Sequence, residues 1–253
     1  FIHFIGFNGA AIATVLSEAI CLVFMLVYIK KKRLFTFKLS DFDKKDIGLL
    51  IQKAVPSVIQ QSIPAISTTF LTALVSTYSI TAIAAYGVTG KLEIIVFYPA
   101  MALNMVLTTI IGQCVGGNRY DRAGDYLKCG LKYGCGLLVI LSVLVVGFSR
   151  QLSELFVRSD EVAEIVGTYF LIVGIGYILN TVTNCYLGSL NGLGKPSKSM
   201  FLMVFYYIIV RMPLAYLLSH LNLGLDGIWF AVLISHVVAS IAAALTGTVY
   251  LKK

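Results

Sequence analysis

Charged side chains are scarce in this sequence. They make up 13% of the 253 residues, hydrophobic residues make up 58%, and the mean hydropathy is +0.88. Charged residues contribute about a quarter of an ordinary soluble domain. The scarcity of charge excludes such a domain and predicts a membrane protein.

Clusters of metal-ligating or redox-active side chains are lacking as well. The sequence has three histidines, and its cysteines stand singly in or beside apolar runs, without a CxxC pair, at Cys21, Cys114, Cys129, Cys135 and Cys185. These cysteines are expected to be core residues rather than metal ligands. Acids, histidines and cysteines do not cluster near a membrane face, so we predict no catalytic residue, no metal and no cofactor, and a protein that is not an enzyme.

Long apolar runs dominate what the sequence does contain. A helix that crosses a bilayer needs about 20 mostly apolar residues, and no run has the pattern of a strand. Such runs occupy residues 5–29, 47–78, 81–112, 130–149, 163–190, 199–219 and 225–250. The sequence therefore predicts an all-α, polytopic membrane protein with seven transmembrane helices.

Basic residues alternate between the loops that separate these runs. One set of loops contains almost all of them, in segments such as 30–46, 119–132 and 195–198, whereas the other set has only Arg150 and Arg158. Lys and Arg are retained on the cytoplasmic side, so we predict a cytoplasmic carboxyl terminus. The net charge of +8 then marks one membrane face and does not indicate a nucleic-acid partner.

One helix opening occurs twice. "GFNGAAIATVLSE" at residues 6–18 and "GLDGIWFAVLISH" at 224–236 share two glycines, an alanine and a serine at a constant offset of 218. This period is too long for a solenoid and indicates a duplicated domain. Both copies end on the basic side, so each repeat needs an even number of helices, and we predict six plus six.

The repeat divides the chain into three predicted parts. Residues 1–29 are the last transmembrane helix of an amino-terminal lobe, 30–46 are a basic cytoplasmic connector, and 47–253 are the carboxyl-terminal six-helix lobe. The chain opens without methionine or a basic leader region, so we expect a fragment whose amino-terminal lobe lies upstream. Parallel repeats of this kind are a transporter architecture, with the substrate path between the halves.

Ionisable residues at membrane depth usually face a cavity and mark a pathway. The candidates for charge coupling are Glu18, Lys91, Glu93 and Arg211, with His236 at the repeat position of Glu18. Lys91 and Glu93 are about 200° apart around a helix and cannot form a side-by-side pair; either could instead snorkel to an interface. Arg211 needs acceptors such as free carbonyls near Pro213 or a carboxylate, and we favour a packing role for it.

Uncharged polar residues gather in two of the runs. Candidates for lining a cleft are Gln60, Gln61, Tyr177, Asn180 and Asn184. Asn180 and Asn184 are four apart and share one helix face with Tyr177. Such groups either hold helices together or line a wet cleft for an organic ligand, and we favour the cleft.

Several of these segments together resemble the multidrug and toxic compound extrusion (MATE) transporters, in a bacterial form. The resemblance covers the whole chain and matches the carboxyl half of the family plus its sixth helix. It is carried by "GAAIATVLSE", "AAYGVTGKLE", "FYPAMAL", "GQCVGGNRYDRA", "GSLNGLGKPSKSM" and "VRMPLAYLL".

The resemblance implies two six-helix lobes around a V-shaped central cleft, in the bacterial cytoplasmic (inner) membrane. Such transporters exchange protons or sodium ions for organic, commonly cationic and amphipathic compounds. The implied partners are a small organic substrate, the lipid bilayer and the missing amino-terminal lobe. By position, the structural motif residues are Pro56, Pro99, Gln113, Arg122 and Pro213, with Gln113 and Arg122 expected to hold a helix connection.

The sequence departs from the family at two places. Some members carry acidic residues where this chain has Pro64 and Asn180. We therefore expect the principal coupling carboxylate to lie upstream, with Glu18 and Glu93 as local substitutes.

Two alternatives stay open. A lipid-linked glycan or polysaccharide flippase of the same superfamily would need a larger and more basic cavity than a drug exporter. A non-transporting membrane subunit is the other alternative.

Overall fold

The computed structural model describes residues 8–32, 44–221 and 223–251, and the regular structure in these ranges is entirely helical. The chain divides into two compact units, residues 1–49 and 50–253, and each is considered by itself. The first unit contains α2 (Asn8–Lys32), whose apolar part is long enough to cross a bilayer. The basic residues that end it, Lys30 to Lys32, still belong to the helix.

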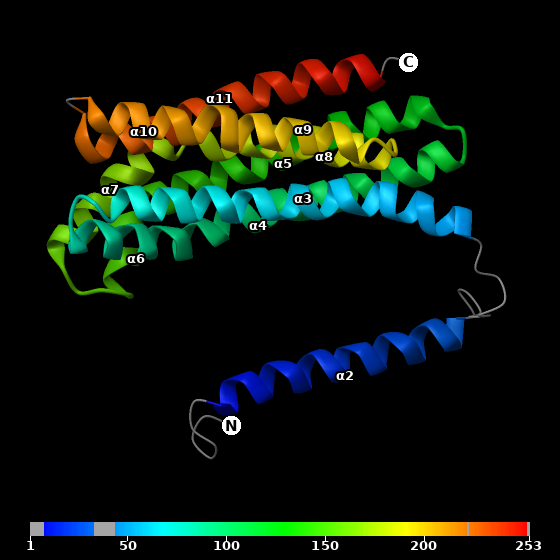
Figure 1. Ribbon diagram of the computed structural model, residues 1–253, viewed down its shortest axis with the longest axis horizontal. Helices are drawn as coiled ribbons and strands as arrows, with labels where there is room; N and C mark the ends of the chain where they lie inside the picture. Colours follow the sequence, from blue (N-terminus) through cyan, green and yellow to red (C-terminus); the bar gives the residue numbers. More distant parts are fainter. Residues whose placement is uncertain (1–7, 33–43, 222, 252–253) are drawn as a thin grey trace. The chain divides into compact units, whose positions relative to one another are not determined.

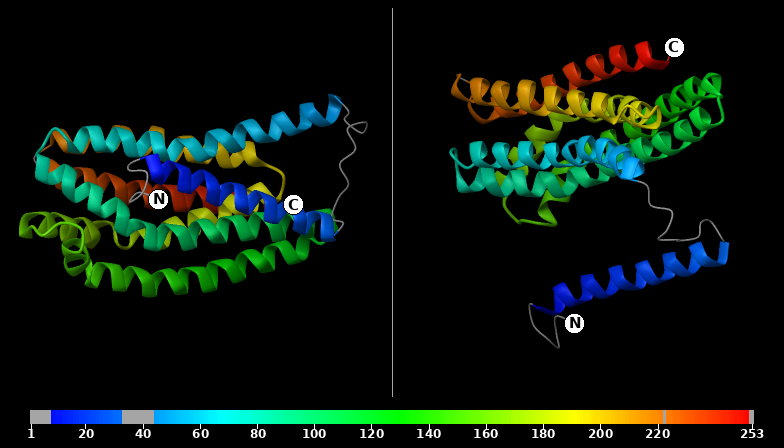
Figure 2. Two further views of the ribbon diagram at one scale, coloured as in Figure 1. Left: turned by 90° about the horizontal axis from the view of Figure 1, so that it is seen from below. Right: turned by 45° about the vertical axis from the view of Figure 1, so that its right-hand side comes forward.

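The second unit is a bundle of long helices that run side by side in alternating directions (Figure 1; Figure 2). In chain order they are α3 (Lys44–Val75), α4 (Ile80–Gly116), α5 (Tyr120–Gly147), the short α6 (Ser149–Glu154), α7 (Asp160–Val173), α8 (Gly176–Gly192), α9 (Pro196–Val204), the π-helix η2 (Phe205–Arg211), α10 (Met212–His220) and α11 (Gly224–Leu251). Their main core contains Phe170 and Trp229, both almost completely buried.

Six described helical spans are long and apolar enough to cross a membrane, and α7 with α8 makes a seventh if the pair is one span. This confirms the predicted all-α fold with seven spans. The run expected at 163–190 is bent by 53° between α7 and α8. A Cβ on Gly174 would lie 2.6 Å from the Phe170 carbonyl oxygen, so the glycine permits the close turn at this bend.

One helix begins earlier than hydropathy predicts. α5 starts at Tyr120, within the segment expected to be a loop before residue 130. Its first turns place Ala123 and Leu127 in a small core while Asp121 lies in the first turn, where a carboxylate stabilises the helix dipole. Hydropathy detects the apolar remainder of such a helix and misses its amphipathic start.

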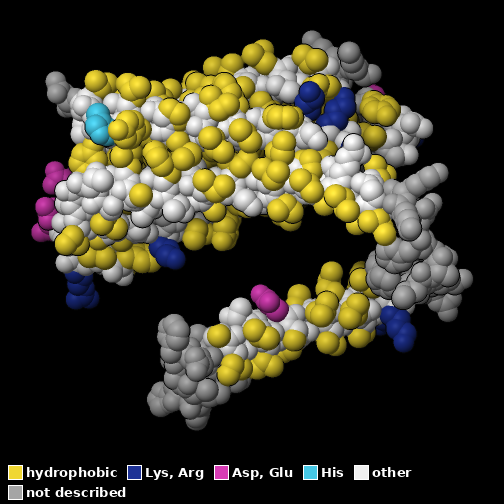
Figure 3. All heavy atoms as spheres, in the orientation of Figure 1, with side chains coloured by type: hydrophobic (Ala, Val, Ile, Leu, Met, Phe, Trp, Pro, Cys, Tyr) yellow, Lys and Arg dark blue, Asp and Glu magenta, His cyan; other side chains and the backbone are white. Residues whose placement is uncertain are grey.

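The helix ends of the second unit sort the charges as expected. One end of the bundle contains the start of α3, the α4–α5 turn, the α8–α9 turn and the end of α11 (Figure 1). Of the basic segments, 119–132 begins in the α4–α5 turn and continues into the first half of α5, and 195–198 begins in the α8–α9 turn and continues into α9. Arg150 and Arg158 follow α5 at the opposite end. In Figure 3, hydrophobic side chains cover the middle of the visible face and most charged side chains lie near the helix ends.

The close approach of α4 and α8 depends on a glycine. A Cβ on Gly188 would lie 2.9 Å from the Asn104 Cα and 3.0 Å from its carbonyl carbon. Thr108 uses this closeness to donate a hydrogen bond of 3.1 Å to the Gly188 carbonyl oxygen. Small residues at helix contacts allow such packing in membranes.

We predict that Gly188→Ala lowers the free energy of unfolding by about 1–3 kcal/mol, because the new methyl group meets backbone that cannot move aside. The matched control is Gly136→Ala, since a Cβ there would meet no atom within 4 Å. That change should raise the free energy of unfolding by about 0.5–1 kcal/mol. Denaturant titration in detergent measures both variants, and equal effects would contradict the packing argument.

Candidate functional site

A cavity of about 1160 Å³ lies inside the second unit. Its walls come from α3, α4, α8, α9, η2 and α11, together with Tyr169 of α7 and Gly194 before α9. Ligand pockets in proteins commonly measure about 300–1,000 Å³. The volume therefore suffices for an organic molecule of drug size.

Helix α3 closes one side of this cavity and is held at both of its ends. Near its start, the Lys53 amine donates a hydrogen bond of 2.5 Å to the Gly194 carbonyl oxygen. Toward its other end, Leu71 and Val75 pack into the core, and the Tyr78 hydroxyl just beyond it donates to the Ser219 carbonyl oxygen at 2.7 Å. Between these anchors, α3 turns polar side chains such as Gln60 toward the cavity.

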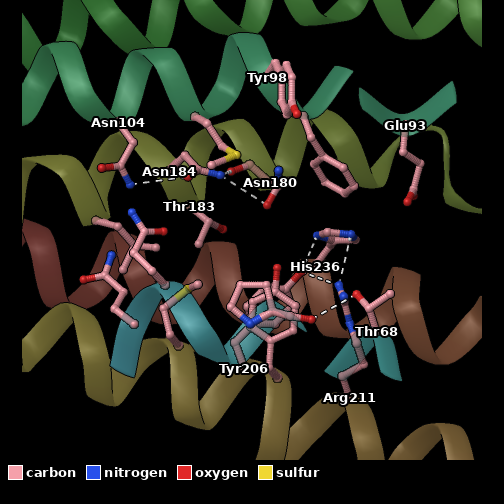
Figure 4. Close-up of a pocket in the computed structure, with 18 of the residues that line it drawn as sticks. Thr68, Glu93, Tyr98, Asn104, Asn180, Thr183, Asn184, Tyr206, Arg211 and His236 are labelled. Carbon is pink, nitrogen blue, oxygen red and sulfur yellow. Dashed lines mark hydrogen bonds between the residues drawn. The ribbon is translucent and has the colours of Figure 1, made fainter. Parts of the chain in front are cut away.

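Glu93 of α4 is the carboxylate that lines the cavity (Figure 4). Its Oε1 accepts hydrogen bonds from the Tyr169 hydroxyl at 2.6 Å and the Tyr177 hydroxyl at 2.9 Å. Both tyrosines are buried and come from opposite sides of the α7–α8 bend. No described residue donates to Oε2, so this oxygen is available to a proton, a metal cation or a ligand.

Arg211 ends the π-helix and is 7% exposed. Its Nε donates to the Ser235 hydroxyl at 2.9 Å, and its Nη2 contacts the Tyr206 hydroxyl and the His236 Nε2, the latter at 3.2 Å. The guanidinium also lies 4.7 and 4.6 Å from the ring centres of Tyr206 and Tyr207. The expectation that Arg211 uses carbonyls near Pro213 or a carboxylate is wrong, because hydroxyl groups and an imidazole hold it instead.

These contacts also determine the charge of His236. A guanidinium only donates hydrogen bonds, so Nε2 of His236 must accept and carries no proton. The ring then keeps its proton on Nδ1, which lies 2.9 Å from the Tyr206 hydroxyl oxygen. The imidazole is therefore neutral, and Arg211 has no negatively charged partner among the described residues.

A row of amide side chains forms another part of the wall (Figure 4). Asn184 of α8 accepts a hydrogen bond of 3.3 Å from Asn104 of α4 and donates one of 3.0 Å to the Asn180 carbonyl oxygen. All three asparagines line the cavity, as does Thr183. The row both joins α4 to α8 and presents polar groups to the cavity.

The structure brings most of the predicted cleft residues to this cavity. Gln60, Gln61, Asn180 and Asn184 line it. Tyr177 does not line it, because its hydroxyl is directed to Glu93 within the core. The cavity is lined by residues of the second unit, whereas the predicted cleft lies between two lobes, so that cleft stays a prediction.

The four charged candidates separate into two groups. Glu93, Lys91 and Arg211 line the cavity, and Lys91 is exposed and makes no hydrogen bond to a described residue. Lys91 and Glu93 do not pair with each other, as their spacing predicts. Glu18 is exposed on α2, in the other unit.

The motif residues lie away from the polar contacts of the cavity. Pro56 and Pro99 are inside α3 and α4, and Pro213 is the second residue of α10, which follows the π-helix. The connection between α4 and α5 is held by backbone, since the Gly117 amide donates to the Gln113 carbonyl oxygen at 3.0 Å. The side chains of Gln113 and Arg122 are exposed and bond to no other described residue, so the connection role expected for these two side chains lacks a visible contact.

Among the lining residues that the sequence analysis did not select as candidates, Asn104, Lys53 and Tyr206 take part in the hydrogen bonds described above. Asn104 belongs to a run chosen for its charges, and Lys53 resembles an ordinary interfacial lysine. Tyr206 lies five residues before Arg211, which is about 140° away on an α-helix. The π-helix brings positions i and i+5 together, and the spacing rules of α-helices do not detect that pair.

We predict that Arg211→Leu lowers the free energy of unfolding by at least about 2 kcal/mol, because Tyr206, Ser235 and His236 lose a charged hydrogen-bond donor. The matched change Lys91→Leu removes a cavity charge that makes no hydrogen bond to the described chain and should stay within about 0.5 kcal/mol. Thermal or denaturant unfolding in detergent compares the two. A similar loss for both variants would show that the Arg211 contacts are not stabilising.

Comparison with known proteins gives a consistent result. The profile of the MatE family matches residues 56–217. The chain is 29% identical over 150 residues to the probable multidrug resistance protein NorM of Pasteurella multocida, covering 57% of this chain and 32% of that protein. It is 24% identical over 234 residues to the uncharacterized transporter YisQ of Bacillus subtilis, covering 90% and 51%. It thus spans about half of these relatives' length or less.

A solved structure of a multidrug resistance MATE family transporter in an outward-facing conformation has the same fold. The TM-score is 0.92 at 22% identity, over 100% of this chain and 58% of that one. The match over most of the chain confirms the family that the sequence motifs indicated, and these relatives are transporters rather than enzymes. The chain belongs to the MatE family of multi-pass membrane transporters.

Proposed function

We propose that this chain supplies one lobe of an antiporter that exports amphipathic organic compounds across the bacterial cytoplasmic membrane in exchange for protons or sodium ions. The observation that carries the proposal is a large cavity, within a membrane-spanning helix bundle, that contains a carboxylate. Ionisable groups at this depth are costly and mark ion or substrate pathways. The proposed orientation places the basic helix ends, including the carboxyl terminus, on the cytoplasmic side, where Lys and Arg are retained.

Glu93 is the group in the described chain that suits ion coupling. Two tyrosine hydroxyls fix one of its carboxylate oxygens, and the other oxygen remains free. Glu18 lacks such an environment, because it is exposed on α2. Of the two local substitutes predicted from the sequence, the geometry supports Glu93, while a further coupling carboxylate upstream remains part of the proposal.

The two lobes then alternate access to the cavity. Coupling requires only that the ion and the substrate favour different states of the transporter. A proton or a sodium ion on the free oxygen of Glu93 would change the charge presented to a substrate in the same cavity. A cationic substrate, which the resemblance predicts, would meet this carboxylate directly.

A flippase for a lipid-linked glycan or polysaccharide is the second candidate function. It is favoured by the basic groups of the cavity, since Lys53 lines it in addition to Lys91 and Arg211. Such a substrate carries phosphate and is much larger than a drug. Translocation of a fluorescent lipid-linked oligosaccharide, without export of small dyes, would support this function.

The coupling role of Glu93 predicts the behaviour of Glu93→Gln in the complete transporter. A glutamine can still accept the tyrosine hydrogen bonds, but it cannot take up a proton or neutralise a cation. We expect substrate export driven by a proton or sodium gradient to fall at least about tenfold while substrate binding persists. Proteoliposomes loaded with a fluorescent organic dye measure the export.

The matched control is Glu164→Gln, which changes an exposed acid outside the cavity. It should export dye at the original rate. Unchanged gradient-driven export by Glu93→Gln would assign the coupling to another residue. Absence of export by the unaltered transporter, with either gradient and with small dyes of either charge, would refute the antiporter proposal itself.

A further inference from the structure

More cationic than acidic side chains line the cavity. Lys53, Lys91 and Arg211 contribute three cationic side chains, and Glu93 is the acidic residue of the lining. His236 is neutral, as its contact with Arg211 requires. The cavity of the described chain therefore carries a net positive charge whether Glu93 is ionised or not.

Arg211 is the most buried of these charges. It is 7% exposed, and its hydrogen-bond partners Ser235, Tyr206 and His236 are uncharged. The ion pair found among the described residues joins Lys128 and Asp125, far along the chain on α5. A buried guanidinium without an anion keeps much of its desolvation cost, and an incoming anion would reduce that cost.

The guanidinium also has donors that remain unused. Nε donates to Ser235, and Nη2 serves Tyr206 and His236, so the N–H groups of Nη1 have no partner in the described chain. The enclosed polar atoms without partners belong to Ser67, Ser142, Asn191 and Trp229, and Nη1 is not one of them. Arg211 lines the cavity, and these N–H groups are the donors that it has left for a ligand there.

The walls around these charges suit a flat apolar body. Phe97, Tyr98 and Tyr207 line the cavity with aromatic rings, and Met101 and Met203 add flexible thioether side chains. Aromatic faces and methionines adapt to planar organic groups of different outline. Such a lining binds the apolar part of a ligand while the cationic groups select its charge.

We infer that the cavity binds amphipathic organic anions, with a carboxylate, sulfonate or phosphate of the ligand at the free edge of Arg211 and Lys91 as the second charge. This inference rests on the proposed transport function and names its substrate class. It differs from the cationic class that the family resemblance predicts. The same anionic group could be presented by a dissolved organic molecule or by a lipid headgroup, and we assign the dissolved molecule because the lining is rich in aromatic rings.

The test uses two dyes with the same xanthene skeleton and opposite charge, the anion fluorescein and the cation rhodamine 123. Binding to the purified protein is measured by fluorescence polarisation in nanodiscs of phosphatidylcholine. We expect fluorescein to bind more tightly than rhodamine 123. Arg211→Gln should weaken fluorescein binding at least about tenfold, as expected for loss of charge-assisted hydrogen bonds.

Three further variants keep the test decisive if Arg211→Gln does not fold. Lys91→Gln removes an unbonded cavity charge and should weaken fluorescein binding about threefold or more through lost attraction. Lys198→Gln makes the same change at an exposed position outside the cavity and should leave binding unchanged. Arg211→Lys keeps the charge and should retain part of the affinity.

Equal or tighter binding of rhodamine 123 would overturn the inference. Fluorescein affinity that is unchanged in both Arg211→Gln and Lys91→Gln would overturn it too. If phosphatidylglycerol in the nanodiscs abolishes the Arg211-dependent binding of fluorescein, the occupant is a lipid headgroup and the dissolved anion is excluded. These measurements report binding and not transport, so their outcome is independent of the export assay that tests the proposed function. Export of rhodamine 123 alone would uphold the antiporter and reject the anion class.

Discussion

A bilayer offers the polypeptide backbone no hydrogen-bond partners, and the rest of this structure depends on that constraint. Each segment that crosses the membrane must satisfy its own amide and carbonyl groups, which is why the described chain is helical throughout its regular structure. Departures from the α-helix are tolerated where protein surrounds them or where they line a cavity. Tyr206 and Arg211 of the π-helix line the cavity, as do Tyr169 and Asn180 on either side of the α7–α8 bend.

The same constraint explains how the polar groups are arranged. A lone hydroxyl, amide or charge is costly in an apolar interior, which favours hydrogen bonds between such groups. Glu93 has two tyrosines, Arg211 has three uncharged partners, and the asparagines of α4 and α8 bond to one another. What remains unpaired on these groups points into the cavity, and those leftover oxygens and N–H groups are what a substrate or an ion can use.

The cavity brings side chains of opposite charge into one space. The chain belongs to the MatE family and shares the fold of a solved family member. The cavity adds a place within one lobe where a carboxylate and three basic side chains face the same space. Opposite charges within one chamber allow the occupancy of an ion site to alter the affinity for a charged substrate, which is the requirement for coupled exchange.

The sequence by itself determined the helices and their number, because hydropathy is a local property that decides whether a segment can cross a bilayer. The placement of Lys and Arg adds a predicted orientation. It also pointed to Glu93, Arg211, Asn180 and Asn184, since polar groups at membrane depth are rare. Only the tertiary structure decided what those groups bind. The pairing of Tyr206 with Arg211 depends on a π-helix, and the partners of Glu93 come from two helix segments that meet at a bend. Neither the bend nor the π-turn leaves a periodic pattern, because each arises from packing between segments far apart in the chain.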